Sequence, residues 1–140
     1  MQISHHYSPY EKKTYVAVTN NEIAKLFVIV DHDMEPLHEI HAKEIDHEGV
    51  PSGTANDGPK DFDEEKRLTR VLMYKELSAY LLKLMKKEPV DLIICAPEAY
   101  KNEIFEHMHT DVQKSAKEIV PKNLASLPLD QIIRILQEIR

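Results

Sequence analysis

The stretch Val90–Pro97 constrains the fold more than any other part of the chain. It reads VDLIICAP, a short and almost continuous apolar run with Pro89 before it and Pro97 at its end. Half-exposed strands alternate apolar and polar residues, whereas strands of a parallel sheet covered on both faces are apolar throughout. We therefore expect Val90–Cys95 to be a parallel strand that is buried on both faces.

Helical periodicity is found on both sides of this strand. Phe62–Glu88 is predicted to be the main helix, because acidic residues lie at its start and lysines at its end, as the helix dipole favours. We expect its apolar stripe to be core rather than a cofactor site, and we assign no cofactor; the stripe comprises Leu68, Val71, Leu72, Leu77, Leu81, Leu84 and Met85. Glu98–Met108 and Leu129–Ile139 are predicted to be shorter helices, the last with Ser126 as its N-cap.

The N-terminal third of the chain predicts three strands. Thr14–Thr19 and Ile23–Val30 are rich in β-branched and apolar residues, and the Asn20-Asn21 pair between them favours a hairpin turn. A polar break at Asp31–Pro36 separates them from Leu37–Ile45, whose mixed pattern is typical of an edge strand. Near the other end of the chain, Lys117–Val120 is a short strand candidate.

The predicted order of elements is strand, strand, strand, helix, strand, helix, strand, helix. Three early strands followed by alternating helices and strands predict an α/β fold with a mixed sheet, order βββαβαβα, and helices on both faces. This is the order of the ribonuclease H-like fold. We expect residues 14–140 to form a single domain and residues 1–13 to be a loose N-terminal arm.

Composition excludes several classes of function. The chain has 140 residues and a net charge of −6, which argues against a sequence-independent grip on nucleic acid, so that contact with RNA would need a local basic patch. Its one cysteine, Cys95, allows no internal disulfide and is expected to be a buried structural thiol. No apolar run approaches membrane-spanning length and no signal peptide is recognisable, so we expect no membrane partner and a cytoplasmic location.

The segment Asp46–Asp61 is the candidate functional loop. It contains all three glycines and two prolines, and it has no periodicity. Long segments of this kind are either functional or plain surface connections, and both alternatives stay open here. The residues that we assign to the candidate loop are Gly49, Ser52, Gly53, Asn56, Asp57, Gly58 and Lys60.

Two kinds of metal chemistry are not supported. A two-metal nuclease on this fold needs acids in the middle of the first strand and near the end of the strand after the first helix. Thr14–Thr19 contains no acid, and Asp91 lies at the start of its strand. His38 and His41 are the metal candidates among the histidines, but strand alternation places them on opposite faces, and we assign no metal site.

Three stretches resemble a known bacterial family. They are EIAKLFVIVD at the end of the hairpin, VDLIICAPEAY, and the terminal KEIVPKNLASLPLDQIIRIL. Together they resemble the host attachment proteins, also called proteins required for attachment to host cells, which are similar to the middle domain of archaeal and eukaryotic peptide-chain release factors. The matching motifs are Ala96-Pro97 and Lys122-Asn123-Leu124, and the resemblance spans residues 14–140.

The resemblance implies a translation-factor-like domain with the ribosome or tRNA as its partner. In release factors, a Gly-Gly-Gln tripeptide on the loop before the first long helix helps water attack the peptidyl-tRNA ester. The equivalent loop here, Asp46–Asp61, has no Gly-Gly-Gln. The resemblance therefore favours a non-catalytic binding domain over peptide release.

A second class of function stays open. The length and polarity of the candidate loop would also suit a small metal-assisted hydrolase or nuclease that uses Asp31, Asp33 and Asp61. A role as a surface adhesin, which the family name suggests, fits poorly with the missing export signal. The sequence does not determine the oligomeric state.

Overall fold

The computed structural model describes residues 1–42, 59–88 and 90–139, and of residues 59–63 it describes only the backbone. At its centre is a five-stranded sheet with the strand order β3-β2-β1-β4-β5. The strands are β1 Tyr10–Thr19, β2 Ile23–Asp31, β3 Asp33–His41, β4 Asp91–Cys95 and β5 Ala116–Val120. The first three pair antiparallel, and β4 is parallel to both β1 and β5. The predicted α/β class with a mixed sheet is confirmed.

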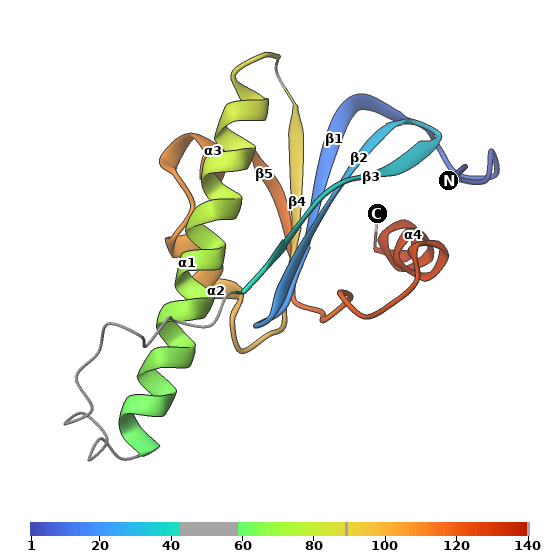
Figure 1. The fold of residues 1–140 in the computed structure, drawn as a ribbon. Helices are drawn as coiled ribbons and strands as arrows, with labels where there is room; N and C mark the ends of the chain where they lie inside the picture. Colours follow the sequence, from blue (N-terminus) through green and yellow to red (C-terminus); the bar gives the residue numbers. More distant parts are fainter. Residues whose placement is uncertain (43–58, 89, 140) are drawn as a thin grey trace.

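Helices cover both faces of the sheet (Figure 1). Helices α1 Pro59–Met85, α2 Lys101–Glu106 and α3 Thr110–Ser115 lie on one face, and α4 Leu129–Glu138 lies on the other. Each face has its own hydrophobic core: Leu77 and Leu81 of α1 belong to one, Ile132 and Leu136 of α4 to the other. The sheet therefore separates two cores, as a sheet in an α/β protein does.

Strand β4 explains why Val90–Pro97 constrains the fold. Leu92 and Ile94 belong to the core under α1, and Ile93 and Cys95 belong to the core under α4. None of the four side chains is more than 7% exposed. The prediction of a parallel strand buried on both faces is confirmed.

The third strand differs from its prediction. It begins at Asp33 instead of Leu37, because the expected polar break is a tight turn at Asp31 and His32. Asp31 has a φ of 59°, a left-handed conformation that Asp tolerates better than most residues do. The predicted strand end at Ile45 lies outside the described residues.

A β-bulge at Leu37 changes which residues of β3 face each core. Leu26 of β2 pairs with His38, while Phe27 pairs with Pro36, so Leu37 is the extra residue. Met34 consequently belongs to the core under α4, and Ile40 belongs to the core under α1, although six residues separate them and a regular strand would place both on one face.

The prediction of a loose arm for residues 1–13 is wrong for much of that segment. Gln2 forms a β-bridge with Asp33, and the Met34 amide donates to the Met1 carbonyl at 2.9 Å. Ile3 is only 2% exposed and packs in the core under α4. A single buried apolar residue without periodicity leaves no pattern, which is why the arm was predicted to be loose.

Three helix predictions also need correction. The predicted helix Glu98–Met108 is shorter in the structure, where α2 spans Lys101–Glu106, and a further short helix, α3, follows the turn at His107–His109. The N-cap of α4 is Pro128, which makes no side-chain cap bond, and not Ser126. In α1, Leu68 and Leu72 are 46% and 53% exposed, so they do not belong to the core stripe.

Candidate functional site

Four strands end at one edge of the sheet, which we call the carboxyl edge. Strands β1, β4 and β5 are parallel, and β3 runs in the same direction because both β1 and β3 pair antiparallel with β2. Their last residues are Thr19, His41, Cys95 and Val120. In open α/β sheets, ligands gather outside the carboxyl ends of the strands. This edge, the lower one in Figure 1, is therefore where a binding site is expected.

Buried hydrogen bonds tie the strand ends together. The Thr19 hydroxyl donates to the Cys95 carbonyl at 2.9 Å, and the Ala96 amide donates to the Val120 carbonyl at 3.0 Å. Ala96 has no exposed surface, so there is no room for a larger side chain at this position. The Ala96-Pro97 step is thus the structural link between the ends of β4 and β5.

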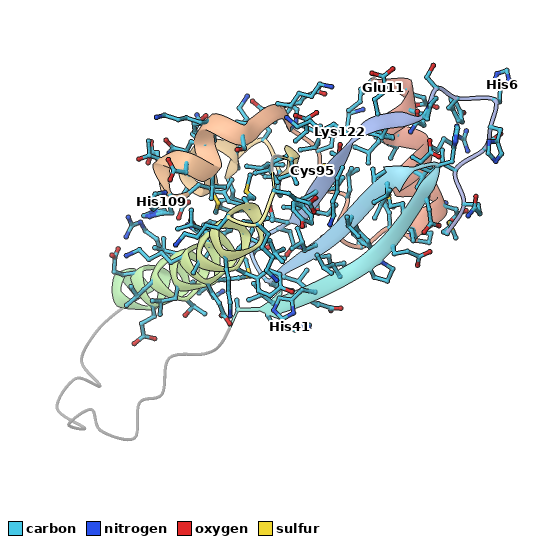
Figure 2. All side chains as sticks on the ribbon, turned by 90° about the horizontal axis from the view of Figure 1, so that it is seen from above. His6, Glu11, His41, Cys95, His109 and Lys122 are labelled. Atoms are coloured by element: carbon cyan, nitrogen blue, oxygen red, sulfur yellow. The ribbon has the colours of Figure 1, made fainter. Side chains whose placement is uncertain are left out.

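The turn after β5 presents polar side chains on the surface. The Lys122 amide donates to the Val120 carbonyl at 2.8 Å, which bends the chain directly after the strand. Leu124 and Ala125 are both 2% exposed and anchor the turn in the core, whereas Lys122 and Asn123 are exposed. Val120, two residues before Lys122, pairs with Cys95 at the end of β4, and Figure 2 labels both Lys122 and Cys95. The two motifs of the family resemblance therefore meet at the carboxyl edge.

An ion pair between α1 and α2 supports the same edge. The Arg70 guanidinium donates to both Glu103 carboxylate oxygens, with nitrogen–oxygen distances of 3.0 to 3.2 Å. The guanidinium carbon also lies 4.5 Å from the centroid of the Tyr100 ring, a cation–π contact. Since the Tyr100 amide donates to the Pro97 carbonyl at 2.9 Å, the pair holds the turn after β4 against α1. Arg70 and Glu103 are structural residues that single-sequence patterns do not pair.

Two buried groups near this edge are poor acids and nucleophiles. Burial raises the pKa of the Cys95 thiol to about 12, so the thiol stays protonated at neutral pH. Burial also raises the pKa of the Tyr74 hydroxyl well above its usual range. Within the described part of the chain this hydroxyl has no hydrogen-bond partner. The expectation that Cys95 is a buried structural thiol is confirmed.

Two of the acids named for a hydrolase lie far from the carboxyl edge, and the side chain of the third, Asp61, is not described. Asp31 and Asp33 lie at the turn between β2 and β3, and β3 then runs about 26 Å to the carboxyl edge. Glu11, the one acid in β1, is exposed near the start of the strand, and Asp91 forms an ion pair with Lys12 at 3.5 Å. Among residues 1–42, 59–88 and 90–139, no group of three or more His, Cys, Asp or Glu residues could hold a metal ion.

The two metal candidates, His38 and His41, lie on opposite faces of β3. The His38 ring stacks on the Tyr80 ring of α1, with centroids 4.2 Å apart and an interplanar angle of 11°. The His41 Nε2 lies 3.0 Å from the Glu39 carboxylate, on the other face. Figure 2 shows His6, His41 and His109 on three separate parts of the molecule. The alternation that the sequence predicts for His38 and His41 is confirmed.

His109 has a role that its position in the sequence does not reveal. It is the N-cap of α3, and its Nδ1 accepts a hydrogen bond from the Asp111 amide at 3.1 Å. An acceptor at this position satisfies one of the first amides of the helix, which have no partner within it.

Most of the candidate loop lies outside the described residues. This applies to Gly49, Ser52, Gly53, Asn56, Asp57 and Gly58. Lys60 lies in the first turn of α1, and its side chain is not described. Ala42, the last described residue before the loop, donates its amide to the Glu22 carbonyl at 2.8 Å at the carboxyl edge. The described chain before the loop therefore ends at the same edge as Pro97 and Lys122.

A groove of about 480 Å³ lies between the edge strand β3 and the segment before α4. Pro36 and Leu37 of β3 form one wall, and Leu127, Pro128 and Leu129 belong to the other. The sequence gives no sign of this groove, since it depends on the bulge at Leu37 and on where the chain crosses from β5 to α4.

The fold is similar to that of two solved translation factors. The archaeal translation termination factor aRF1 matches with a TM-score of 0.54 at 15% identity, over 77% of this chain and 29% of that one. Dom34 of S. cerevisiae, described as a translation termination-like factor in RNA quality control that interacts with Hbs1, matches with a TM-score of 0.53 at 13% identity. That match covers 92% of this chain and 34% of Dom34. The fold is thus that of a release factor-like domain, and this chain spans about a third of the length of either structure or less.

The family follows from the sequence comparison. The model of bacterial archaeo-eukaryotic release factor family 12 matches residues 13–136. Because this match covers nearly the whole chain, the protein belongs to that family. None of the curated proteins matches the chain. In the described part of the chain, no helix has the length and apolar character needed to cross a membrane. The release factor-like part of the expected resemblance is confirmed.

Proposed function

We propose that this protein is a binding domain that acts in translation, with the ribosome or tRNA as its partner. The observation that carries the proposal is the match to a release factor-like family over residues 13–136. The two similar structures support it, since both are described as translation termination or termination-like factors. Work at the ribosome would place the protein in the cytoplasm.

The carboxyl edge is the surface that we assign to the partner. Its strand ends are fixed by buried hydrogen bonds, and the Arg70–Glu103 pair fixes the turn after β4. On this supported edge, Lys122 and Asn123 are exposed. An exposed ammonium group beside an amide suits the phosphates of RNA, and a preformed surface loses little conformational entropy on binding.

Binding is favoured over peptide release. The segment Asp46–Asp61 lacks the Gly-Gly-Gln tripeptide that the resemblance associates with ester hydrolysis. The alternative, a metal-assisted hydrolase or nuclease around this segment, has less support because Asp31 and Asp33 lie at the far edge of the sheet. Metal-dependent cleavage of RNA or an ester that vanished on substitution of Asp61 would favour the alternative.

Two finer assignments belong to the same proposal. The strand order β3-β2-β1-β4-β5, with β2 antiparallel to its neighbours, supports the ribonuclease H-like class and a single domain over residues 14–140. Membership of the host attachment proteins stays a prediction from Ala96-Pro97 and Lys122-Asn123-Leu124. Neither assignment changes which surface we expect to bind.

Ribosome co-sedimentation tests the proposal. The purified chain is mixed with bacterial ribosomes at moderate salt and centrifuged through a sucrose cushion. We expect it to pellet with ribosomes and to stay in the supernatant without them. Its complete absence from the ribosomal pellet, together with no binding to tRNA in a gel-shift experiment, would refute the proposal.

A further inference from the structure

The face of α1 that points away from the sheet has a second regular pattern. Its residues are spaced alternately by four and three positions, which is the spacing of a helix–helix seam. They are Leu68, Leu72, Lys75, Ala79, Leu82 and Lys86. Leu68, Leu72 and Ala79 are exposed apolar residues, Leu82 is half-buried and packs partly against the core under α1, and Lys86 lies just beyond the end of the helix.

The seam lies opposite the core stripe. Leu68 and Leu77 are nine residues apart, which is about 180° around an α-helix at 100° per residue. Leu77 is 1% exposed and faces the sheet, whereas Leu68 and Leu72 are 46% and 53% exposed. Figure 1 shows that α1 lies along the outside of the molecule and extends beyond the edge of the sheet. The outer face of α1 is thus geometrically accessible to another helix.

Charges along this face identify the partner. Glu64, whose side chain is 69% exposed and lies 3.4 Å from the Arg67 guanidinium of the same helix, is at the beginning of the seam, and Lys83 and Lys86 lie exposed at its end. A helix with acid at one end, leucines near the middle and lysines at the other end is complementary to a second copy of itself running antiparallel.

We propose that the protein forms a homodimer through antiparallel pairing of α1 with α1 of a second copy. Pairing around a two-fold axis between Leu72 and Lys75 places Glu64 opposite Lys83 of the other copy and Leu68 opposite Ala79. Near the axis, the aliphatic stem of Lys75 covers Leu72 of the other copy while its ammonium group stays in water. A small residue opposite a leucine lets the two helices approach closely.

A second copy fits this face better than RNA does. The lysines alone would suit phosphates, but Glu64 would repel them and Leu68 and Leu72 would stay exposed to water. In the antiparallel dimer the two leucines are buried, and each Glu64–Lys83 contact occurs twice because the interface is symmetric.

Sedimentation velocity of the full chain over a range of concentrations tests the dimer. The unaltered protein should show a reversible monomer–dimer equilibrium, and Leu68→Lys should weaken it by roughly tenfold or more, since a buried apolar contact becomes a charge. Val30→Lys is the control: Val30 is 52% exposed on β2, away from α1, and its substitution should leave the equilibrium unchanged. Circular dichroism checks that each variant is folded.

A charge exchange tests the antiparallel register. Glu64→Lys and Lys83→Glu should each weaken dimerisation by roughly three- to tenfold, and the double variant should recover most of the loss because the opposite charges face each other again. Three results would overturn the proposal: a protein that stays monomeric at high concentration, a double variant that dimerises no better than the single ones, or lysines of this face that bind tRNA in a monomer.

Discussion

Arg70 and Glu103 are 33 positions apart in the sequence and join α1 to α2 through a bidentate ion pair, in which the side chains are only 14% and 20% exposed. The pair lies against the Tyr100 ring and so connects α1 to the turn that follows β4. Because the two charges are mostly shielded from water, removing one of them would leave the other without a counter-charge.

Loss of both partners of this pair should cost less than the two single losses added together. Glu103→Gln should lower the free energy of unfolding by about 2 kcal/mol, because the half-buried guanidinium loses its counter-charge. The double variant Arg70→Met/Glu103→Leu should lose less stability than Arg70→Met and Glu103→Leu lose in sum, as measured by urea denaturation.

The exposed pair Arg134–Glu138 is the matched control. Its side chains are 74% and 63% exposed, so Arg134→Met should change stability by less than about 0.5 kcal/mol. Additive effects at Arg70 and Glu103 would show that the two side chains do not stabilise each other.

Tyr74→Phe should stabilise the protein. The ring of Tyr74 is completely buried and its hydroxyl has no hydrogen-bond partner among the described residues, so the hydroxyl loses its water without compensation. Removing it should raise the free energy of unfolding by about 1 kcal/mol, measured by thermal or urea denaturation. A loss of stability of similar size would mean that the hydroxyl is bonded in solution.

Stability should fall above pH 9 because of Cys95. Burial raises the pKa of this thiol from 9.0 to about 12, so the unfolded chain releases the proton at a pH where the folded chain retains it. The contribution is therefore fully present below pH 9 and is lost as the pH rises towards 12.

The slope of stability against pH between 9 and 11 is the quantity to measure. Cys95→Ala should make that slope shallower, whatever it does to the absolute stability. Some slope should remain, because the raised pKa of Tyr74 contributes in the same direction. Alkylation offers a second check: iodoacetamide at pH 8 should react slowly with the native protein and rapidly in denaturant. Equal rates in both states would contradict the burial of the thiol.

His38 and His41 should respond differently to the same substitution. His38→Ala removes a ring that stacks on Tyr80 and should cost about 1 kcal/mol of stability. His41→Ala removes an exposed side chain on the other face and should cost less than about 0.5 kcal/mol. If the two variants were equally destabilised, or if both lost a bound zinc ion, the account of β3 would be wrong.

Much of the fold could be predicted because, in several segments, the residue types and their spacing determine the structure without distant contacts. The apolar run of β4 shows that it is buried on both faces, and the α4 stripe of Ile132, Ile133 and Leu136 follows helical spacing. At Asn20, whose side chain accepts hydrogen bonds from the Glu22 and Ile23 amides, the residue type itself favours the turn.

Features that depend on distant contacts could not be predicted in this way. Ile3 is buried only because β3 and α4 are next to it, and the bulge at Leu37 depends on its pairing with β2. Leu68 and Leu72 fit a helical stripe in the sequence, but the sheet does not reach their side of α1. For the site, Ala96-Pro97 and Lys122-Asn123-Leu124 could be named from the sequence, whereas their meeting at one edge follows from the parallel pairing of β4 with β5.

The most direct test of the translation role compares two charge reversals in ribosome co-sedimentation. Lys122 is exposed at the carboxyl edge. Lys114 is exposed on α3, directly before β5 begins, and so lies near the opposite edge of the sheet. If the carboxyl edge binds ribosomal RNA or tRNA, Lys122→Glu should reduce the pelleted fraction several-fold, while Lys114→Glu should leave it unchanged; doubling the salt should weaken binding of the unaltered protein. Equal pelleting of both variants would remove the carboxyl edge from the interface, and a protein that never pellets with ribosomes and does not bind tRNA would contradict the account.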